Sequence, residues 1–310
     1  NTNWLDEITS MGSTTNNAVS VSGGNENAVY YFGASHYTEN GILNGTSFKR
    51  TNLNSRNQFK VLDDKVKITQ NINISIAGAT PKPTSAFTNA YQQAPIMPVR
   101  YANGRYAKPF LNSLGFNDMS GEKYNDNANP VAQLELFNEE NKFITLSGSV
   151  GAEIKIVNDL KFNSSFGATY DIQKGYTFTP LLQIWLSENP TLEASQMPVS
   201  NKLNTLQQRN IDNYMWNWDN YLTYSKTFDK NKFTAVAGMS QSTRENGSVM
   251  KITRNNVPEQ SNYWSTDFST DLTPTNPASV AENTHSTPIL SLAYFTRLEY
   301  EFDNKYLLSG

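Results

Sequence analysis

The chain has 310 residues, a formal net charge of −3 and no cysteine. This charge gives no support for nucleic-acid binding, and the lack of cysteine excludes disulfides and Cys-based zinc or redox sites. The mean hydropathy is −0.56, and no apolar run approaches the length of about 18 residues that a membrane-spanning helix needs. These two observations exclude a helical membrane protein. A membrane β-barrel remains possible, because its strands are apolar on one face only.

The clearest strand signals are segments in which apolar and polar residues alternate. The range 66–77 alternates throughout, and only Gln70 interrupts its apolar row. The range 144–156 alternates in the same way and the pattern resumes at 160–171, so a short turn at 157–159 predicts a tight hairpin. Ranges 29–37 and 233–242 have weaker patterns and are expected to be strands from their context.

Two later segments continue the pattern. The range 214–224 places Tyr214, Trp216, Trp218 and Tyr224 on one face, and 290–301 does the same with leucine and tyrosine. The charges keep to the other face of each strand, as the following residues show: Lys67, Glu153, Lys161 and Arg297. Such segregation suits lipid, because a cation facing the bilayer midplane costs about 2 to 4 kcal/mol.

The connections between the expected strands alternate in length. Tight turns are expected near 23–27, 62–64, 158, 229–231 and 303–304, and long links at 39–47, 80–142, 173–211 and 246–288. In an up-and-down sheet every second connection lies at the same end, so all long links share one end, as in outer-membrane barrels. The sequence therefore predicts an all-β, antiparallel, up-and-down transmembrane β-barrel, present in part, with long extracellular loops at 80–142, 173–211 and 246–288. Residues 1–310 are expected to form one partial barrel domain cut from a longer chain.

Several short motifs occur in an order that is similar to the SusC/RagA family of TonB-linked outer-membrane proteins. They include Trp4–Ile8, Val19–Gly24, Phe48–Arg50, Asn129 with Pro130, and the segment from Arg297 through Tyr300 to Asn304–Leu308. The resemblance covers nearly the whole chain. Asn3 and Glu299 depart from the family pattern, which usually has Asp and Asn there.

This resemblance implies a barrel of twenty-two strands in the outer membrane of a Gram-negative, Bacteroidetes-like cell. It further implies a plug, energy supplied through TonB, and a SusD-like surface lipoprotein over the extracellular mouth. By that comparison the chain begins inside the first extracellular loop, with a short helix at 4–11, and contains about ten strands. The plug, the TonB-binding region and the closing strands are expected to lie outside it.

The long links are the best candidates for ligand contact, because loops carry binding residues on a rigid scaffold. We expect an oligosaccharide or an oligopeptide as the ligand. The candidate ligand-binding residues combine aromatic rings with polar groups: Arg100, Tyr101, Asn103, Arg105, Tyr106, Trp185, Tyr263 and Trp264. The alternative is that these rings pack the loops together or against the lid. By contrast, Tyr214, Trp216, Trp218 and Tyr224 are expected to face lipid as an interface girdle.

No metal or cofactor site is expected. His36 and His285 have no second ligand at metal spacing, and the oxygen-rich run from Asp118 to Asn129 lacks the order of an EF-hand. No catalytic arrangement of side chains can be argued from spacing, so the chain is not expected to be an enzyme.

Two other functions remain open at this point. A soluble or surface-anchored β-sandwich that binds carbohydrate would also show alternating strands and aromatic loops. A plain receptor barrel of the siderophore type would share the transmembrane strands. The arrangement of the strands separates the sandwich from both barrels, because a sandwich needs two packed sheets.

Overall fold

The computed structural model describes residues 1–108, 126–198, 204–270 and 281–310. The strands are β1 (Ser13–Gly24), β2 (Ala28–Asn40), β3 (Ser47–Val61), β4 (Val66–Thr80), β5 (Asn138–Val157), β6 (Leu160–Thr179), β7 (Thr205–Phe228), β8 (Asn231–Asn255), β9 (Ala281–His285), β10 (Ile289–Phe302) and β11 (Tyr306–Ser309). The helices are α1 (Trp4–Ile8), α2 (Ser85–Gln92), α3 (Pro130–Glu135) and α4 (Leu181–Glu188). Among the described residues no helix is long and apolar enough to span a membrane.

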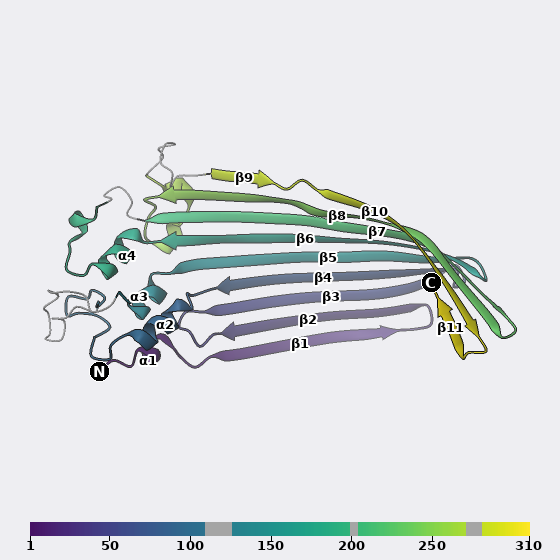
Figure 1. Ribbon diagram of the computed structural model, residues 1–310, viewed down its shortest axis with the longest axis horizontal. Coiled ribbons are helices and arrows are strands. Elements are labelled where there is room, and N and C mark those ends of the chain that lie inside the picture. Colours follow the sequence, from purple (N-terminus) through teal and green to yellow (C-terminus); the bar gives the residue numbers. More distant parts are fainter. Residues whose placement is uncertain (109–125, 199–203, 271–280) are drawn as a thin grey trace.

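The strands form a single antiparallel sheet in which each strand pairs with its neighbours in sequence. The order is β1 to β8, then β10 and β11, and β9 pairs with β8 beyond the end of β10. Figure 1 shows the strands side by side in chain order, with all four helices at one end. The predicted up-and-down sheet is confirmed, and the single sheet rules out the β-sandwich alternative.

The strands extend farther than the alternation predicts. β6 continues to Thr179 and β7 begins at Thr205, so the link between them is shorter than the predicted 173–211. β8 continues to Asn255 within the predicted link 246–288, and His285 closes β9 instead of lying in a loop. The alternation does not reveal these extensions, because charged and amide side chains interrupt the apolar rows beyond the apolar band. At the start of the chain the expected helix at 4–11 ends earlier, at Ile8.

The predicted tight turns are present at the end of the sheet opposite the helices. Asp63, Asp64, Asp229, Asp303 and Asn304 have φ between 49° and 61°, in the left-handed region. Asp and Asn adopt this conformation more readily than most residues, because their short polar side chains bond to the nearby backbone. We call this end the turn end, and the end that carries the helices the loop end.

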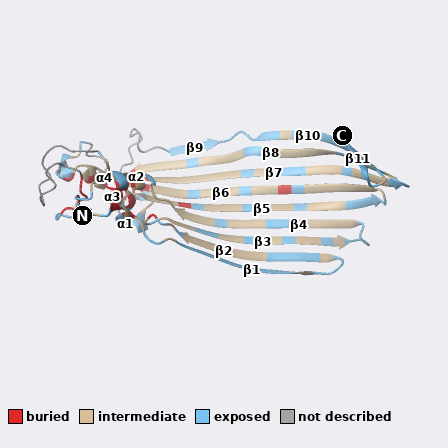
Figure 2. Cartoon of the chain, turned by 60° about the horizontal axis from the view of Figure 1, so that its bottom comes forward, coloured by how far each residue is buried: buried red, intermediate tan, exposed pale blue. Residues whose placement is uncertain are grey.

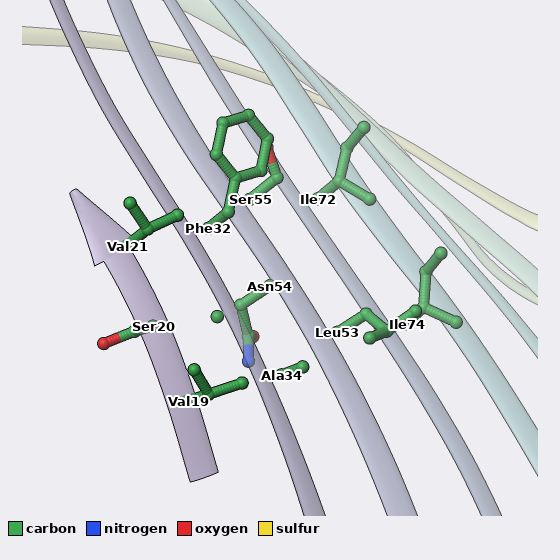
Figure 3. Close-up of a pocket in the computed structure, with 11 residues that line it drawn as sticks. Val19, Ser20, Val21, Phe32, Ala34, Leu53, Asn54, Ser55, Ile72 and Ile74 are labelled. Carbon is green, nitrogen blue, oxygen red and sulfur yellow. The ribbon is translucent and has the colours of Figure 1, made fainter. Parts of the chain in front are cut away.

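The register aligns the predicted apolar rows into one continuous face, because residues directly opposite each other point to the same side of a sheet. Leu53 lies opposite Ile74, Ile74 opposite Leu146, and Leu146 opposite Tyr170. Figure 3 shows the beginning of this surface in two rows, Val21 to Ile72 and Val19 to Ile74, which border a recess of about 390 Å³. We call this surface the apolar face and the other the polar face. The large side chains of the apolar face remain exposed, as the membrane-facing wall of a barrel requires.

The polar face collects the charges that the sequence predicts there. Lys67 lies opposite Glu153, and Lys161 contacts Glu153 at 3.1 Å. Amides and hydroxyls fill much of the remaining surface, as in the row Asn54, Asn73, Ser147 and Thr169. Buried residues, in contrast, gather mainly around the helices and links at the loop end (Figure 2). The sheet therefore has no core of its own, and the packed core of the chain lies beside it.

The one polar interruption of the apolar row in β4 has a partner on β3. Gln70 lies opposite Asn57, whose Nδ2 donates to Gln70 Oε1 at 2.5 Å and to Ser55 Oγ at 2.9 Å. A polar side chain on a lipid-facing surface is costly unless its groups bond to each other. This bond satisfies one group of each amide, whereas Asn57 Oδ1 and Gln70 Nε2 are buried with no hydrogen-bond partner among the described residues.

We expect Asn57→Leu alone to destabilise the barrel by about 1 to 3 kcal/mol, because it leaves the Gln70 amide without its partner. The double variant Asn57→Leu/Gln70→Leu should be close to the parent or more stable, since no unpaired amide remains. Denaturant unfolding of the complete chain in lipid vesicles measures both values. If the loss in the double variant equalled the sum of the losses in Asn57→Leu and Gln70→Leu, the two amides would not act as a pair.

Candidate functional site

The loop end is built around a small hydrophobic core that joins the start of the chain to the link after β4. Trp4 is buried and its Nε1 donates to the Ala94 carbonyl at 3.0 Å. The buried members of this cluster come from α1, α2, α3 and the segments between them: Trp4, Ile8, Leu43, Ala86, Ala90, Met97, Tyr101, Ala107 and Leu134. The described parts of the long link are therefore folded against α1, which gives them a fixed position at the loop end of the sheet.

Asn129 organises the start of α3. Its Oδ1 accepts from the backbone amides of Val131 and Ala132, and its Nδ2 donates to the carbonyls of Val99 and Ala107 at 2.9 and 3.1 Å. Asparagine is a preferred residue at this position because it satisfies the free amides of the first turn. Asn129 is 1% exposed, and these bonds occupy both ends of its amide. It therefore acts as a structural residue and not as a cation ligand.

Three side chains meet on the outer side of α3. Arg100 Nη2 and the Tyr106 hydroxyl both contact Glu135 Oε2 at 2.5 Å, and the Arg100 guanidinium lies 3.8 Å from the centre of the Tyr106 ring. Burial, and then the hydrogen bond to Glu135, raise the pKa of Tyr106 to about 12. Two of the predicted ligand-binding residues thus belong to one cluster that holds the 100–106 hairpin against α3.

The remaining residues of that predicted group also make contacts within the chain. Tyr101 is buried and its hydroxyl donates to the Lys108 carbonyl at 2.8 Å. Arg105 Nη2 lies 3.1 Å from Glu193 Oε2, and its Nη1 donates to the Pro190 and Leu192 carbonyls. Asn103 is exposed and accepts from the Arg105 amide at 3.0 Å. Arg105 therefore joins the link before β5 to the link before β7.

The three other candidate aromatic residues lie in different places. The Trp264 ring stacks on Phe178 with the ring centres 4.3 Å apart, which makes it part of a second small cluster with Leu206 and Val257. Tyr263 is 54% exposed and contacts the edge of Phe268. Trp185 lies half-buried in α4. The candidates therefore do not converge on one pocket.

The four residues expected to form an interface girdle lie on the apolar face. Tyr214 is opposite Tyr170 near the loop end of the apolar band, and Tyr224 is opposite Leu160 near the turn end. Trp216 and Trp218 lie between them, where Trp216 stacks on Phe166. The two tyrosines therefore lie near opposite ends of the apolar band on β7, and their role in an interface girdle stays a prediction.

A buried lysine joins the two long links. Lys108 is fully buried, and its Nζ contacts Glu188 Oε2 at the end of α4 and donates to the Asn127 carbonyl at 3.2 Å. A buried ammonium is costly unless it is paired and hydrogen-bonded. This ion pair therefore fixes α4 to the preceding link. Sequence reasoning gave no signal for it, because lysine is almost never fully buried.

A cavity of about 320 Å³ opens between α3, α4 and the loop end of β6. Its lining is mainly apolar, with a few polar groups from three elements. The principal residues are Gln133, Phe137, Thr177, Phe178, Ile184 and Glu188. Ligand pockets commonly start at about 300 Å³ and combine an apolar lining with a few polar groups. This cavity is therefore the candidate site for ligand contact at the loop end.

The polar face holds a second candidate surface, a groove of about 650 Å³ that crosses β3 to β7. Its polar residues are mostly amides and hydroxyls: Asn54, Arg56, Asn71, Asn73, Ser147, Ser149, Thr169 and Asn217. Amides and hydroxyls both donate and accept hydrogen bonds, so they contact varied polar molecules without selecting for charge. This groove would line the interior of a closed barrel.

An ion pair near the loop end joins β7 to β5 across the strand between them, β6. Arg209 Nη2 on β7 contacts Glu139 Oε1 on β5 at 2.5 Å and Asn141 Oδ1 at 2.6 Å, passing over Gly175 of β6. A Cβ on Gly175 would lie 2.6 Å from Asn141 Oδ1 and 3.3 Å from Arg209 Nε. Glycine is therefore required here for the arginine to reach across the strand.

Neither histidine gathers metal ligands. His36 Nδ1 lies 2.9 Å from Thr51 Oγ1, and His285 is exposed. In residues 1–108, 126–198, 204–270 and 281–310 no three His, Asp or Glu side chains come together as a metal site. Asp118 and Glu122 of the oxygen-rich run lie outside the described residues.

The raised pKa of Tyr106 predicts a pH dependence. The folded chain holds the phenol protonated up to a pH of about 12, whereas an unfolded tyrosine ionises near 10.0. The stabilisation is therefore complete below pH 10 and is lost as the pH rises from 10 towards 12. We expect the protection factors of the amides at 99–107, which correct for the base-catalysed rise in intrinsic exchange, to fall over this interval, and the Tyr106→Phe variant to lack this fall. The same fall in the variant would assign it to another group.

Comparisons with known proteins agree with this fold. No protein-family model matches the sequence. The chain is 24% identical over 326 residues to TonB-dependent receptor P3 of Formosa agariphila, and 24% identical over 334 residues to TonB-dependent receptor SusC of Bacteroides thetaiotaomicron. Each match covers 100% of this chain and 29% of the relative, so the chain spans less than a third of these proteins.

A solved structure of the RagAB peptide importer in its open-open state has the same arrangement of strands. The TM-score is 0.73 at 16% identity, over 99% of this chain and 32% of the solved chain. These relatives are named as receptors and an importer, and their names point away from an enzyme. The sheet described above is thus an arc of outer-membrane barrel wall. Over its whole length the chain is similar to SusC/RagA-type TonB-linked outer-membrane proteins, which confirms the resemblance seen in the sequence.

Proposed function

We propose that the chain supplies part of the wall and mouth of a TonB-dependent importer that carries a large nutrient across the outer membrane. The observation that carries this proposal is the two-faced sheet, with a continuous apolar face, an amide-rich polar face and folded links at one end only. The polar face would line the passage, and the links would form the extracellular mouth. The resemblance to SusC and RagAB supports a SusD-like lipoprotein as the partner above the mouth and TonB as the energy source.

The loop-end cavity favours an oligopeptide over an oligosaccharide. Phe137, Phe178 and Ile184 give it an apolar lining that suits peptide side chains, and Gln133 can bond to a peptide backbone. The side chains of Arg100, Tyr101, Arg105 and Tyr106 contribute by fixing the links that frame the cavity. Asn103 and Tyr263, which are exposed, could meet the ligand or the lipoprotein directly.

The test measures uptake by cells that depend on the complete transporter. Thr177→Trp fills the cavity at the end of β6, and Asn158→Trp places the same ring in the exposed turn between β5 and β6 as a control. We expect Thr177→Trp to reduce uptake of labelled oligopeptides at least tenfold and the control to leave it unchanged. A selective loss of oligosaccharide uptake would reassign the substrate class. Loss of iron-chelate uptake alone would favour a siderophore-type receptor.

Co-purification tests the lipoprotein partner separately. The complete chain, extracted in mild detergent, is expected to retain a SusD-like lipoprotein at a ratio near one to one. A chain that imports nutrient without any such partner would contradict this part of the proposal while leaving the transport activity in place.

A further inference from the structure

Three lysines face outward just beyond the apolar band at the loop end. Lys142 lies directly opposite Lys174, and Gly78 separates Lys142 from Lys49 in the same row. All three are exposed and share the side of the sheet that carries Ile144 and Ile172. Those isoleucines are two residues nearer the turn end, which places the lysines about 7 Å beyond the last apolar row.

Charge balance in this row favours an external anion. Among the described residues Lys49 and Lys174 make no ion pair, and Lys142 Nζ is 3.6 Å from Glu140 Oε1. Glu140 also accepts from the Tyr176 hydroxyl at 3.0 Å, and Asp212, the other nearby carboxylate, accepts from Ser248 Oγ. Two like charges directly opposite each other destabilise a sheet. A bound anion would remove that repulsion.

The lysines of β5 and β6 also border a recess of about 380 Å³. Its other side chains on the apolar face belong to Glu140, Tyr176, Gln208 and Asn210. Ammonium groups bind phosphate as point charges, and amides and a phenol can bond to sugar hydroxyls. Directly below the recess, Ile144 and Ile172 begin the apolar face that would contact acyl chains.

At the turn end of the apolar face, the outward-facing lysine has a carboxylate partner. There Lys226 faces outward on β7, and it pairs with Asp159 at 3.1 Å. In the described strands, the unpaired outward-facing cations of the apolar face therefore lie at the loop end. Basic groups beside a membrane-spanning wall attract anionic lipid headgroups.

We propose that Lys142 and Lys174, with Lys49 beside them, form a site for a phosphorylated glycolipid of the leaflet at the loop end. The phosphate lies between the two ammonium groups, the sugar fills the recess and the acyl chains run along Ile144 and Ile172. The site is separate from the passage, because Lys142 and Lys174 are on the opposite face of the sheet from the amide-rich groove. It depends on the membrane-facing role of the apolar face and not on the nutrient that is carried.

The experiment compares two lysine pairs on the same hairpin. Lys155 and Lys161 are also directly opposite each other on β5 and β6, but on the polar face near the turn end. The complete chain is placed in bilayer discs that contain lipid A or its dephosphorylated form, and bound lipid is counted by native mass spectrometry. Lys142→Gln/Lys174→Gln is compared with Lys155→Gln/Lys161→Gln and with Lys142→Arg/Lys174→Arg. An unchanged melting temperature shows that each variant is folded.

Each lysine near an anionic membrane surface contributes about fivefold in affinity, so the glutamine pair at 142 and 174 should weaken lipid A binding about 30-fold. The polar-face pair and the arginine pair should bind lipid A as the parent does. Equal binding of dephosphorylated lipid, or no change in Lys142→Gln/Lys174→Gln, would overturn the proposal. Displacement of the lipid by millimolar inorganic phosphate would instead make this a site for free anions.

Discussion

Ile72→Arg is expected to destabilise the barrel by about 2 to 4 kcal/mol in a bilayer, whereas Asn71→Arg, one residue away, should cost close to nothing. Ile72 lies near the middle of the apolar row of β4 and is 45% exposed on the apolar face. Asn71 points to the other side, where its Nδ2 donates to Ser149 Oγ at 3.3 Å. An arginine at 72 would have to lie in hydrocarbon, while one at 71 would meet water and amides.

The measurement is denaturant unfolding of the complete chain in vesicles, with both variants at the same lipid composition. The pair is a close control, because backbone, strand and depth in the membrane are nearly the same at the two positions. A larger loss for Asn71→Arg than for Ile72→Arg would mean that the polar face meets lipid, and would reverse the inside and outside of the barrel wall.

Glu188→Gln is expected to open the contact between α4 and the preceding link at a cost of about 3 to 5 kcal/mol, because it leaves a fully buried ammonium without its counter-ion. Lys108→Met should cost less, since the Glu188 side chain is 41% exposed and water can solvate it. The double variant Lys108→Met/Glu188→Gln should resemble Lys108→Met, because it removes the buried charge altogether.

Hydrogen exchange of the amides at 99–108 and 181–189 in the complete chain measures this opening. Glu193→Gln is the matched control: it removes the partner of Arg105 from the neighbouring contact, but Glu193 is 74% exposed, so the loss should stay below about 1 kcal/mol. Equal effects of Glu188→Gln and Glu193→Gln would show that burial of Lys108 does not set the strength of its ion pair.

The sequence predicts the sheet well because its information is local. Alternation over a few residues determines which face each side chain takes, so the rows containing Ile74, Leu146 and Tyr170 could be placed before their register was known. The strand ends could not be placed this way. Beyond the last apolar row, lysine, arginine and amide side chains such as Lys174 and Gln208 interrupt the alternation, so the ends of the strands resemble loops in composition.

The candidate site was harder to predict because its contacts join residues far apart in the chain. Arg100 meets Glu135 and Arg105 meets Glu193, and no short-range pattern indicates such pairs. The sequence identified the 100–106 segment as rich in aromatic and cationic groups, but those groups also suit the packing of one link against another. The sequence does not indicate the cavity residues Thr177 and Glu188, because the residues around them come from three separate elements.

The strand order has a consequence for how the chain assembles. Each tight turn closes a hairpin of two neighbouring strands, so β3 with β4, or β5 with β6, can form from a short and continuous stretch of sequence. Each doubling of link length adds only about 0.6 kcal/mol to the free-energy cost of closing a loop. The long links at the loop end therefore add little to the cost of joining one hairpin to the next. Such local contacts favour rapid folding. The wall can therefore grow hairpin by hairpin from either edge, and each hairpin added supplies the unpaired edge on which the next one forms.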